Sequence, residues 1–470
     1  MQLADVKQVY FIGIGGIGMS AVARYFNGCG LRVSGYDKTE TPLTQALEAE
    51  GIAIHYGAAN VDLVPPPADD LLVVWTPAIP RDFPELVLVA SGNGTSPEAT
   101  TPRYNLMKRS AVLGLISRGM KCIGIAGTHG KTTTTTITTK LMTVAGLSPH
   151  AFLGGIPRDF DGNYVAGDSD WVVVEADEYD RSFLQLDPTI AVILSCDPDH
   201  LDIYGDHDTM LETGFRAYAR RVVDGGHLIV RYDVADEFVG PGKRFLWTFG
   251  IGTGDFSAHN IHVKDGAFHF DLTEPDGHLI TNIRTALPGR HNIENAVAAC
   301  AVTRLAGGDE AALREGLSTF RGIARRFETV LKTDKIVIID DYAHHPTELE
   351  AAITAARELY PDKAIRGVFQ PHLFSRTQDF AAGFARALDL LDEAILIPIY
   401  PARELPVPGV TSKIIFDKME AANRRLLSDD MMLDATAELT DGVLLLLGAG
   451  DIDALIPKIV TQHKNTLTHG

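Results

Sequence analysis

Cysteine is scarce in this sequence, with four residues in 470, namely Cys29, Cys122, Cys196 and Cys300. They lie far apart and form no CxxC pair, which excludes a disulfide framework and a thiolate zinc site. Long apolar runs are missing too: none reaches the ~18 residues of a membrane-spanning helix, and no basic segment followed by an apolar stretch opens the chain. We therefore expect a cytoplasmic protein with reduced thiols, no secretory leader and no membrane insertion.

Positive charge is also in deficit. The chain has 42 Lys and Arg against 61 Asp and Glu, a formal net charge of −19. This charge excludes a protein that coats nucleic acid, because such binding depends on neutralising phosphates. Nucleotide binding stays open, since it needs only a local positive site. Apolar residues make up 45% of the chain, enough for several cores, and a length of 470 residues predicts two to four domains.

A short β-branched run, a glycine turn and a helical stretch follow one another at 9–18, 121–132, 335–346 and 442–452. Further strand-like runs lie at 71–76, 171–178, 190–196, 364–369 and 394–400. Continuous apolar strands that alternate with helices indicate parallel sheets buried on both faces. We predict three α/β domains over 1–115, 116–322 and 323–470, with a loop at 91–102. Alternating polarity within 225–287 predicts a small antiparallel sheet in the middle domain.

The first glycine motif is Gly13-x-Gly15-x-x-Gly18, between a predicted strand and a predicted helix. Glycines at such a turn let a phosphate approach backbone N–H groups at the helix N-terminus. Asp37 ends the next predicted strand, where an acid bonds a ribose hydroxyl in dinucleotide folds. The motif by itself favours a nicotinamide cofactor, with a purely structural turn as the alternative.

The second motif runs from Gly127 to Thr133 and also joins a strand to a helix. Its amides can surround a β- or γ-phosphate, Lys131 can neutralise charge, and the Thr132 hydroxyl can bind Mg²⁺. Ile125 stands where the full Walker spacing requires glycine, and this short form is typical of a narrower class of ATP users. An empty glycine turn is the weaker alternative.

Acidic residues follow two further strands. Glu175 ends a buried-looking strand and can hold Mg²⁺. Asp177, Glu178 and Asp180 come directly after it, and a solvated acidic turn explains these three as well as a functional role does. His200 lies between acids in 197–202, where a ligand crevice is expected. Imidazole suits Mn²⁺ better than Mg²⁺, and a surface histidine is the alternative.

Polar pairs and cations mark the remaining chain. Asn292 and Asn295 share one helix face, where two amides can read a base, although helix capping by Asn292 is equally favoured. Cations and acids follow predicted strands of the third domain at 340–346, 375–377 and 402–404, and a further group lies at 325–328. Arginines that converge at one sheet edge can hold a phosphoryl group or a carboxylate.

Taken in order, these segments carry a resemblance over essentially the whole chain. GTHGKTTTT, EADEYDRSF, DPDHLD, PGRHNIEN, ARRFE, DDYAHHPTE, SRT, YPARE and GAGD occur in this order, and together they resemble the Mur ligase family of ATP-dependent amino-acid ligases. The resemblance implies an N-terminal Rossmann-like UDP-sugar domain, a central P-loop ATPase domain and a C-terminal Rossmann-like domain. It further implies that the glycine loop holds a UDP-sugar diphosphate and not a nicotinamide dinucleotide.

Within the family, GIGGIGMS and YPARE resemble the branch that joins L-alanine to the lactyl carboxylate of UDP-N-acetylmuramate, and this resemblance implies a reaction through an acyl phosphate formed from ATP. The alternative is the recycling ligase, which attaches a tripeptide to the same sugar nucleotide. A nicotinamide-dependent oxidoreductase and a non-catalytic nucleotide-binding regulator are further alternatives from other classes. We expect ATP and Mg²⁺, with Mn²⁺ as a substitute, and a monomer or weak dimer with no nucleic-acid partner.

The resemblance also assigns residues. Those implied for the UDP-sugar are Gly15, Gly16, Ile17, Gly18, Met19, Ser20, Asp37 and Thr76. Those implied for ATP are Gly127, Thr128, His129, Gly130, Lys131, Thr132, Thr133, Asn292, Asn295, Arg325 and Asp341. The implied metal ligands are Thr132, Glu175 and His200. The expected catalytic residues are Lys131, His129, Glu175, His200, His344 and Arg376, with His129 near the acyl phosphate and Arg376 on the alanine carboxylate. The segment 320–326 is expected to act as a hinge.

Overall fold

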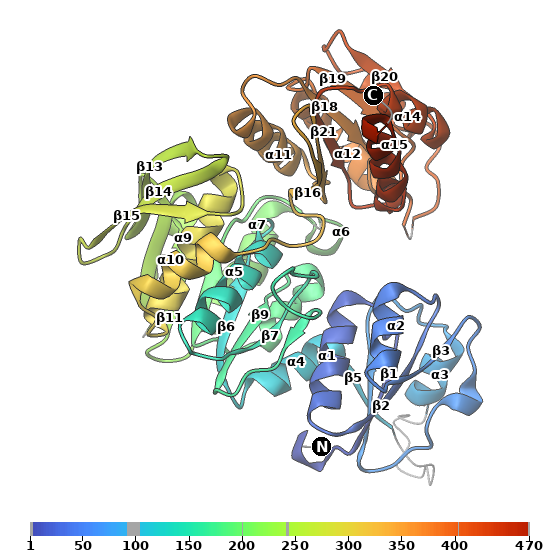
Figure 1. The fold of residues 1–470 in the computed structure, drawn as a ribbon. Helices are drawn as coiled ribbons and strands as arrows, with labels where there is room; N and C mark the ends of the chain where they lie inside the picture. Colours follow the sequence, from blue (N-terminus) through green and yellow to red (C-terminus); the bar gives the residue numbers. More distant parts are fainter. Residues whose placement is uncertain (1–2, 92–103, 200, 241–243, 403, 469–470) are drawn as a thin grey trace. The chain divides into compact units, whose positions relative to one another are not determined.

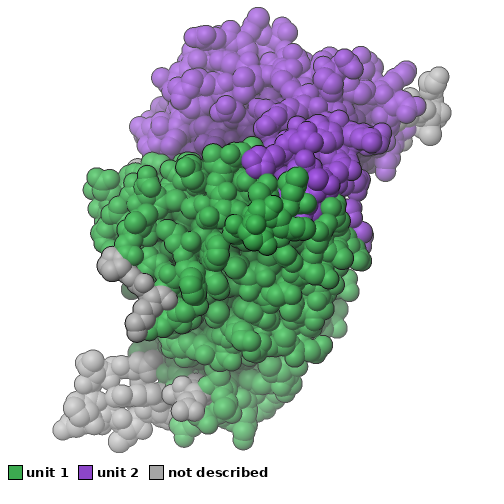
Figure 2. Space-filling view, turned by 90° about the vertical axis from the view of Figure 1, so that its left-hand side faces the viewer, with its two compact units in different colours: residues 1–257, 273–279, 295–317 green, residues 258–272, 280–294, 318–470 purple. Residues whose placement is uncertain are grey.

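Three sheets flanked by helices make up the chain in the computed structural model (Figure 1). The structure describes residues 3–91, 104–199, 201–240, 244–402 and 404–468. The chain forms two compact units (Figure 2). The first comprises 1–257, 273–279 and 295–317, and the second comprises 258–272, 280–294 and 318–470. In the described parts of the chain, no helix is both long and apolar enough to cross a bilayer.

The N-terminal sheet is parallel, with the strand order β3-β2-β1-β4-β5. Its strands are β1 (Gln8–Ile12), β2 (Arg32–Asp37), β3 (Ala53–Tyr56), β4 (Leu71–Trp75) and β5 (Asn105–Lys108), and its helices are α1 (Ile17–Gly28), α2 (Pro42–Ala49), α3 (Pro84–Ser91) and α4 (Arg109–Ser117). Successive residues of β1 enter two different apolar clusters, Phe11 one and Tyr10 the other. The sheet is therefore buried on both faces, as its continuous apolar strands predict.

The central sheet within the first unit has the order β12-β11-β10-β6-β9-β7-β8. These strands are β6 (Lys121–Ala126), β7 (His150–Phe152), β8 (Tyr164–Val165), β9 (Trp171–Glu175), β10 (Ile190–Ile193), β11 (His227–Arg231) and β12 (Phe245–Ile251). All neighbours pair in parallel except β7 and β8. The associated helices are α5 (Lys131–Val144), α6 (Leu201–Tyr204), α7 (His207–Met210) and α8 (Arg216–Ala219).

Three further strands, β13 (Phe256–Lys264), β14 (Ala267–Thr273) and β15 (Leu279–Thr285), are neighbours in the order β15-β14-β13. They lie within 225–287, where a small antiparallel sheet was predicted, and their antiparallel pairing stays a prediction. Helices α9 (Arg290–Leu305) and α10 (Glu310–Thr319) follow them in the chain.

The C-terminal sheet has the order β16-β17-β21-β18-β19-β20. Its strands are β16 (Glu328–Lys332), β17 (Ile336–Asp341), β18 (Ile365–Phe369), β19 (Glu393–Leu396), β20 (Arg424–Leu426) and β21 (Gly442–Leu447), and its helices are α11 (Pro346–Leu359), α12 (Phe374–Leu388), α13 (Lys413–Phe416), α14 (Asp429–Ala437) and α15 (Ile456–Thr468). Only the edge strand β16 pairs antiparallel among these described strands.

The three-domain α/β architecture is confirmed by these sheets. The domain boundaries at 115 and 322 stay predictions, and the predicted loop at 91–102 lies, apart from its first residue, outside the described residues.

Candidate functional site

The first glycine loop lies between the end of β1 at Ile12 and the start of α1 at Ile17. Gly13 has φ +89°, a conformation that glycine adopts without strain. The amide of Gly15 donates to Oδ2 of Asp37 over 2.7 Å, so this carboxylate braces the loop. A ribose contact for Asp37 stays a prediction, and the bracing bond is a role that the sequence reasoning did not assign.

Arg109 lies next to Gly18 in the first turn of α1, and the sequence reasoning missed it. It is the first residue of α4, and a Cβ added to Gly18 would lie 2.7 Å from its Nη1. Within the described part of the chain, no carboxylate pairs with Arg109. A cation here, beside the positive N-terminal end of α1, is stabilised when an anion binds between them. The sequence feature that could have indicated Arg109 is a basic residue at the start of a helix, directly after a strand of the same sheet.

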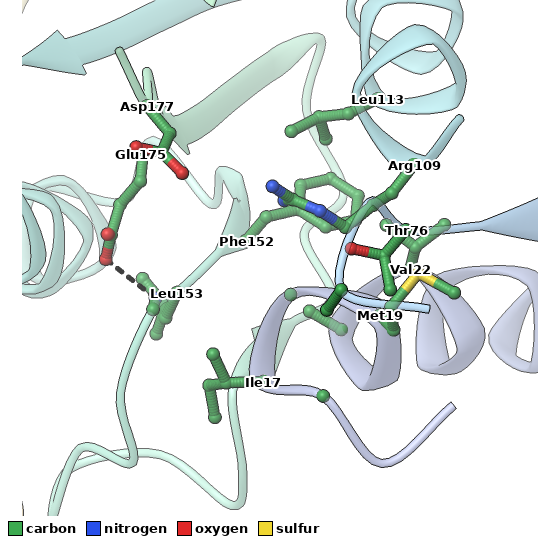
Figure 3. Close-up of a pocket in the computed structure, with 15 residues that line it drawn as sticks. Ile17, Met19, Val22, Thr76, Arg109, Leu113, Phe152, Leu153, Glu175 and Asp177 are labelled. Carbon is green, nitrogen blue, oxygen red and sulfur yellow. Dashed lines mark hydrogen bonds between the residues drawn. The ribbon is translucent and has the colours of Figure 1, made fainter. Parts of the chain in front are cut away.

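A pocket of about 320 Å³ adjoins the loop. One side consists of residues that belong to the N-terminal sheet and its helices, and the other of residues at or just after the ends of β7 and β9 (Figure 3). The lining includes Gly16, Ile17, Gly18, Met19, Thr76 and Arg109 on the first side, and Phe152, Leu153, Gly154, Glu175 and Asp177 on the second. Ser20 lies in the first turn of α1 and is fully buried. A single cavity therefore joins the glycine loop to the acid at the end of β9.

The second glycine loop connects β6 to α5. Gly127 and Gly130 have φ +140° and +82°, and a Cβ on Gly127 would lie 2.8 Å from the Cβ of Leu194. Side chains are thus excluded by both conformation and space. The amides of Thr128 and His129 donate to the backbone oxygen and to Oγ of Ser195, over 3.2 and 3.0 Å. Thr133 follows in the first turn of α5 and is buried.

Lys131 forms a buried ion pair that the sequence reasoning did not anticipate. Its Nζ donates to both carboxylate oxygens of Glu178, over 2.8 and 2.9 Å, and to the carbonyl of Gly127 over 2.7 Å. The side chain of Glu178 is 1% exposed, so a solvated acidic turn is wrong for this residue. Burial alone would lower the pKa of Lys131, but the carboxylates of Glu178 and Asp177 outweigh it and raise that pKa. Burial raises the pKa of Glu178, and Lys131 partly offsets the rise.

Thr132 and Glu175 lie side by side at the start of α5 and the end of β9. The hydroxyl of Thr132 donates to Oε2 of Glu175 over 3.2 Å, and the amide of Gly154 donates to Oε1 over 2.7 Å. Two oxygen donors of this kind fit Mg²⁺, which prefers hard oxygen ligands. His200, the third predicted ligand, lies outside the described residues, and no group of three metal-binding side chains occurs among the residues that are described.

His129 and Asn295 both contact groups around this loop. Nε2 of His129 lies 3.4 Å from a carboxylate oxygen of Asp197. Asn295 is buried on α9, and its Oδ1 accepts a hydrogen bond from Thr134 of α5 over 3.2 Å. Asn292 lies one turn earlier on α9, and its amide donates to the carbonyl of Pro288 over 2.7 Å. The side chain of Asn292 thus ties down the start of its helix, although it makes no N-cap.

Arg325 and Asp341 organise the segment before β16. Arg325 donates through Nη2 to the carbonyls of Gly448 and Gly450, over 2.7 and 3.1 Å. Asp341 accepts from the amide of Phe327 over 2.7 Å, and burial raises the pKa of Asp341 to about 6. Arg325 and Phe327 adopt φ +61° and +49°, a costly backbone that these contacts hold in place.

His344 and Arg376 lie at the carboxyl end of the C-terminal sheet, after β17 and in the first turn of α12. Nδ1 of His344 lies 2.9 Å from the carbonyl of Tyr342 and 3.2 Å from Glu348, and burial lowers the pKa of this histidine. Leu373, before α12, has φ +69°. The two predicted residues therefore share one edge of the sheet.

Comparisons with known proteins identify the family of this chain. Three family models cover most of the chain: "Mur ligase family, catalytic domain" at 8–120, "Mur ligase middle domain" at 125–303 and "Mur ligase, glutamate ligase domain" at 325–452. The chain is a Mur ligase.

Two curated relatives of this Mur ligase carry the same name. UDP-N-acetylmuramate–L-alanine ligases of Cytophaga hutchinsonii and Porphyromonas gingivalis are each 45% identical to it, over 98% of this chain and 97% and 100% of theirs. The solved structure of UDP-N-acetylmuramate-alanine ligase MurC of Thermotoga maritima is similar with a TM-score of 0.80 and 28% identity, covering 98% of this chain and 99% of that one. The murein peptide ligase of Psychrobacter arcticus shares the fold, with a TM-score of 0.69 at 22% identity.

Proposed function

We propose that this Mur ligase joins L-alanine to the lactyl carboxylate of UDP-N-acetylmuramate with hydrolysis of ATP to ADP and phosphate. The names of its relatives support the substrates. The observation that carries the proposal is the pocket, whose lining runs from Gly16 and Arg109 to Gly154 and Glu175. A UDP-sugar whose diphosphate is bound at the glycine loop would extend its sugar toward the phosphate loop through this cavity.

The reaction has two steps. A lactyl carboxylate oxygen attacks the γ-phosphorus of ATP, the bond to the β–γ bridging oxygen breaks, and an acyl phosphate and ADP form. The amine of alanine then attacks the acyl carbon, loses a proton, and the tetrahedral intermediate expels phosphate. Both steps depend on offsetting negative charge around the transferred phosphoryl group.

The chain's residues fit these steps as follows. All three N–H bonds of the Lys131 ammonium are used by Glu178 and Gly127, so a phosphate must replace at least one of these contacts. Thr132 and Glu175 would hold Mg²⁺, which supplies positive charge beside the β- and γ-phosphates when bound. His129 is our candidate for the acyl phosphate, and Arg376 and His344 for the amino-acid end, with Asn292, Asn295, Arg325 and Asp341 as nucleotide contacts.

The test is phosphate release from ATP in the presence of Mg²⁺ and UDP-N-acetylmuramate, with and without L-alanine. We expect release only with L-alanine, together with a product heavier by one alanine residue in mass spectrometry. Release only with the tripeptide would refute the alanine assignment in favour of the recycling reaction. Parallel assays with glycine and L-serine give the selectivity.

A further inference from the structure

The segment 153–163, which we call the bridging loop, connects β7 to β8 and is held at both of its ends and in its middle. At its start, the amide of Gly154 donates to Glu175 over 2.7 Å. In the middle, Asp159 is 3% exposed and pairs with Lys140 of α5 over 2.8 Å. At its end lies Asn163, which is fully buried. The two buried anchors, Asp159 and Asn163, together with the bond to Glu175, fix the shape of this loop.

Asn163 connects the bridging loop to the first helix. Its Oδ1 accepts a hydrogen bond from Nη1 of Arg24, and its Nδ2 donates to the carbonyl of Ile17 and to Oγ of Ser20. All three partners belong to α1, and two of them lie in the first turn, which follows the glycine loop directly. Both N–H donors of the amide and its oxygen are therefore used. Loss of any one partner would leave a buried polar atom without a hydrogen bond, which costs folding free energy.

The hydrogen bonds continue from Asn163 to the phosphate loop. The backbone oxygen of Asn163 accepts from the amide of Leu153 over 2.9 Å. The next amide, that of Gly154, donates to Oε1 of Glu175, whose Oε2 accepts from Thr132 over 3.2 Å. An unbroken series of bonds thus links the first turn of α1 with the first turn of α5.

The side chain at 163 has to be an amide for this purpose. Aspartate would keep an acceptor for Arg24, but it would place a carboxylate oxygen against the carbonyl of Ile17, where no proton is available. Arg24 is 7% exposed and also pairs with Glu50 over 2.7 Å, so it keeps one partner when Asn163 is replaced. The specific loss in such a variant is the contact with the turn after the glycine loop.

We propose that Asn163 is a positioning residue that sets the distance between the glycine loop and the Thr132–Glu175 pair. This inference rests on the proposed function, in which the same UDP-sugar reaches both. Asn163 would touch neither ligand, because its polar atoms are taken up by α1 and the loop. Its effect is on alignment: a misplacement of about 1 Å between reacting groups can cost about 100-fold in rate.

The experiment compares Asn163→Ala and Asn163→Asp with the wild-type chain. Asn27→Ala is the matched control, because Asn27 is also on α1 and its amide donates to a carbonyl, that of Glu50, but in an exposed position. We expect kcat to fall about 30- to 100-fold in both Asn163 variants, by the alignment argument. The Kd values for UDP-N-acetylmuramate and for a non-hydrolysable ATP analogue, measured separately by calorimetry, should change less than about threefold.

A second readout isolates the first chemical step. Scrambling of ¹⁸O between the bridging and non-bridging positions of the β-phosphate of ATP reports reversible acyl-phosphate formation without alanine. It should slow in parallel with kcat in both Asn163 variants and stay at the wild-type rate in Asn27→Ala. Aspartate has nearly the same shape as asparagine and keeps the acceptor for Arg24. The Asn163→Asp variant therefore carries the test if Asn163→Ala does not fold.

Two outcomes would overturn the inference. A lower Tm with unchanged kcat and ¹⁸O scrambling would show a structural role alone, and a Kd for the UDP-sugar that rises while kcat is kept would show direct binding. Both outcomes are changes in the Asn163 variants relative to a wild-type chain that is active. A wild-type chain that releases no phosphate with alanine would instead refute the proposed function.

Discussion

The buried pair of Lys131 and Glu178 gives the sharpest stability prediction. Replacing Glu178 with glutamine keeps the shape of the side chain but removes its charge. The Lys131 side chain is 17% exposed. In this variant its ammonium keeps two neutral acceptors, the carbonyl of Gly127 and the side-chain oxygen of the new glutamine. The carboxylates also raise the pKa of Lys131, so this support for the charged lysine is largely lost.

The expected cost follows from the burial of the pair. Breaking a buried ion pair by removing one partner costs about 3–5 kcal/mol. In a domain of about 150–250 residues each kcal/mol shifts Tm by about 2–4 °C, so the unfolding transition that includes this pair should fall by about 6–20 °C. Replacing both partners, as in Lys131→Met with Glu178→Gln, should recover much of this loss, since no unpaired charge remains buried.

Differential scanning calorimetry at pH 7 measures this shift. The matched control is Asp180→Asn, because Asp180 lies two residues further on, is 37% exposed and pairs with an exposed lysine, Lys108. A surface pair of this kind is worth about 0–1 kcal/mol, so its removal should move Tm by less than about 4 °C. A Glu178→Gln transition within 2 °C of that control would refute the reasoning, as would a double variant less stable than Glu178→Gln.

Three further predictions concern single sites. In Gly154→Ala the new Cβ would collide with both carboxylate oxygens of Glu175, so ligase activity should fall at least about 10-fold (about 1.4 kcal/mol), whereas Gly119→Ala, whose Cβ meets nothing within 4 Å, should keep it. Arg109→Ala should raise the Kd for UDP-N-acetylmuramate about 10- to 150-fold in calorimetry, the worth of one charge-assisted hydrogen bond, and an unchanged Kd would contradict this role. Burial raises the pKa of Asp340 to about 7, above the ~3.9 of an unfolded chain, so protonation of this group favours the folded state, and its ionisation costs stability at pH 8 that is regained as the pH falls to 5. Asp340→Asn should therefore raise Tm relative to the wild type at pH 8, and this difference should shrink as the pH falls to 5; a difference that stays constant over that range would count against it.

Sequence patterns predicted the sheets well because strands buried on both faces consist of continuous apolar residues. The short edge strand β16 carries no such pattern, and its antiparallel pairing with β17 was not anticipated. The two glycine loops were predictable for a local reason, since each lies within a few residues of the strand and helix that define it.

The parts of the site that were missed depend on distant contacts. Glu178 stands in an acidic stretch that looks solvated, but Asp180 and Arg181 after it have φ +53°, and Glu178 is buried against Lys131, 47 residues earlier. Asn163 lies 146 residues from Ile17, and nothing near it in the chain indicates that it meets α1. Such roles follow from packing, which spacing along the sequence does not encode.

The pairing of Lys131 with Glu178 has a consequence for how substrates arrive. The pair is neutral as a unit, so the lysine contributes almost no field at long range, and the chain as a whole has a net charge of −19. Two anionic nucleotides therefore approach without steering from this cation, unlike ligands that are drawn into a charged cleft. Attraction by Lys131 begins only at contact distance, where the ammonium can exchange the carboxylate of Glu178 for a phosphate. Recognition of the nucleotide therefore depends on the shape of the phosphate loop and not on a long-range electric field from this lysine.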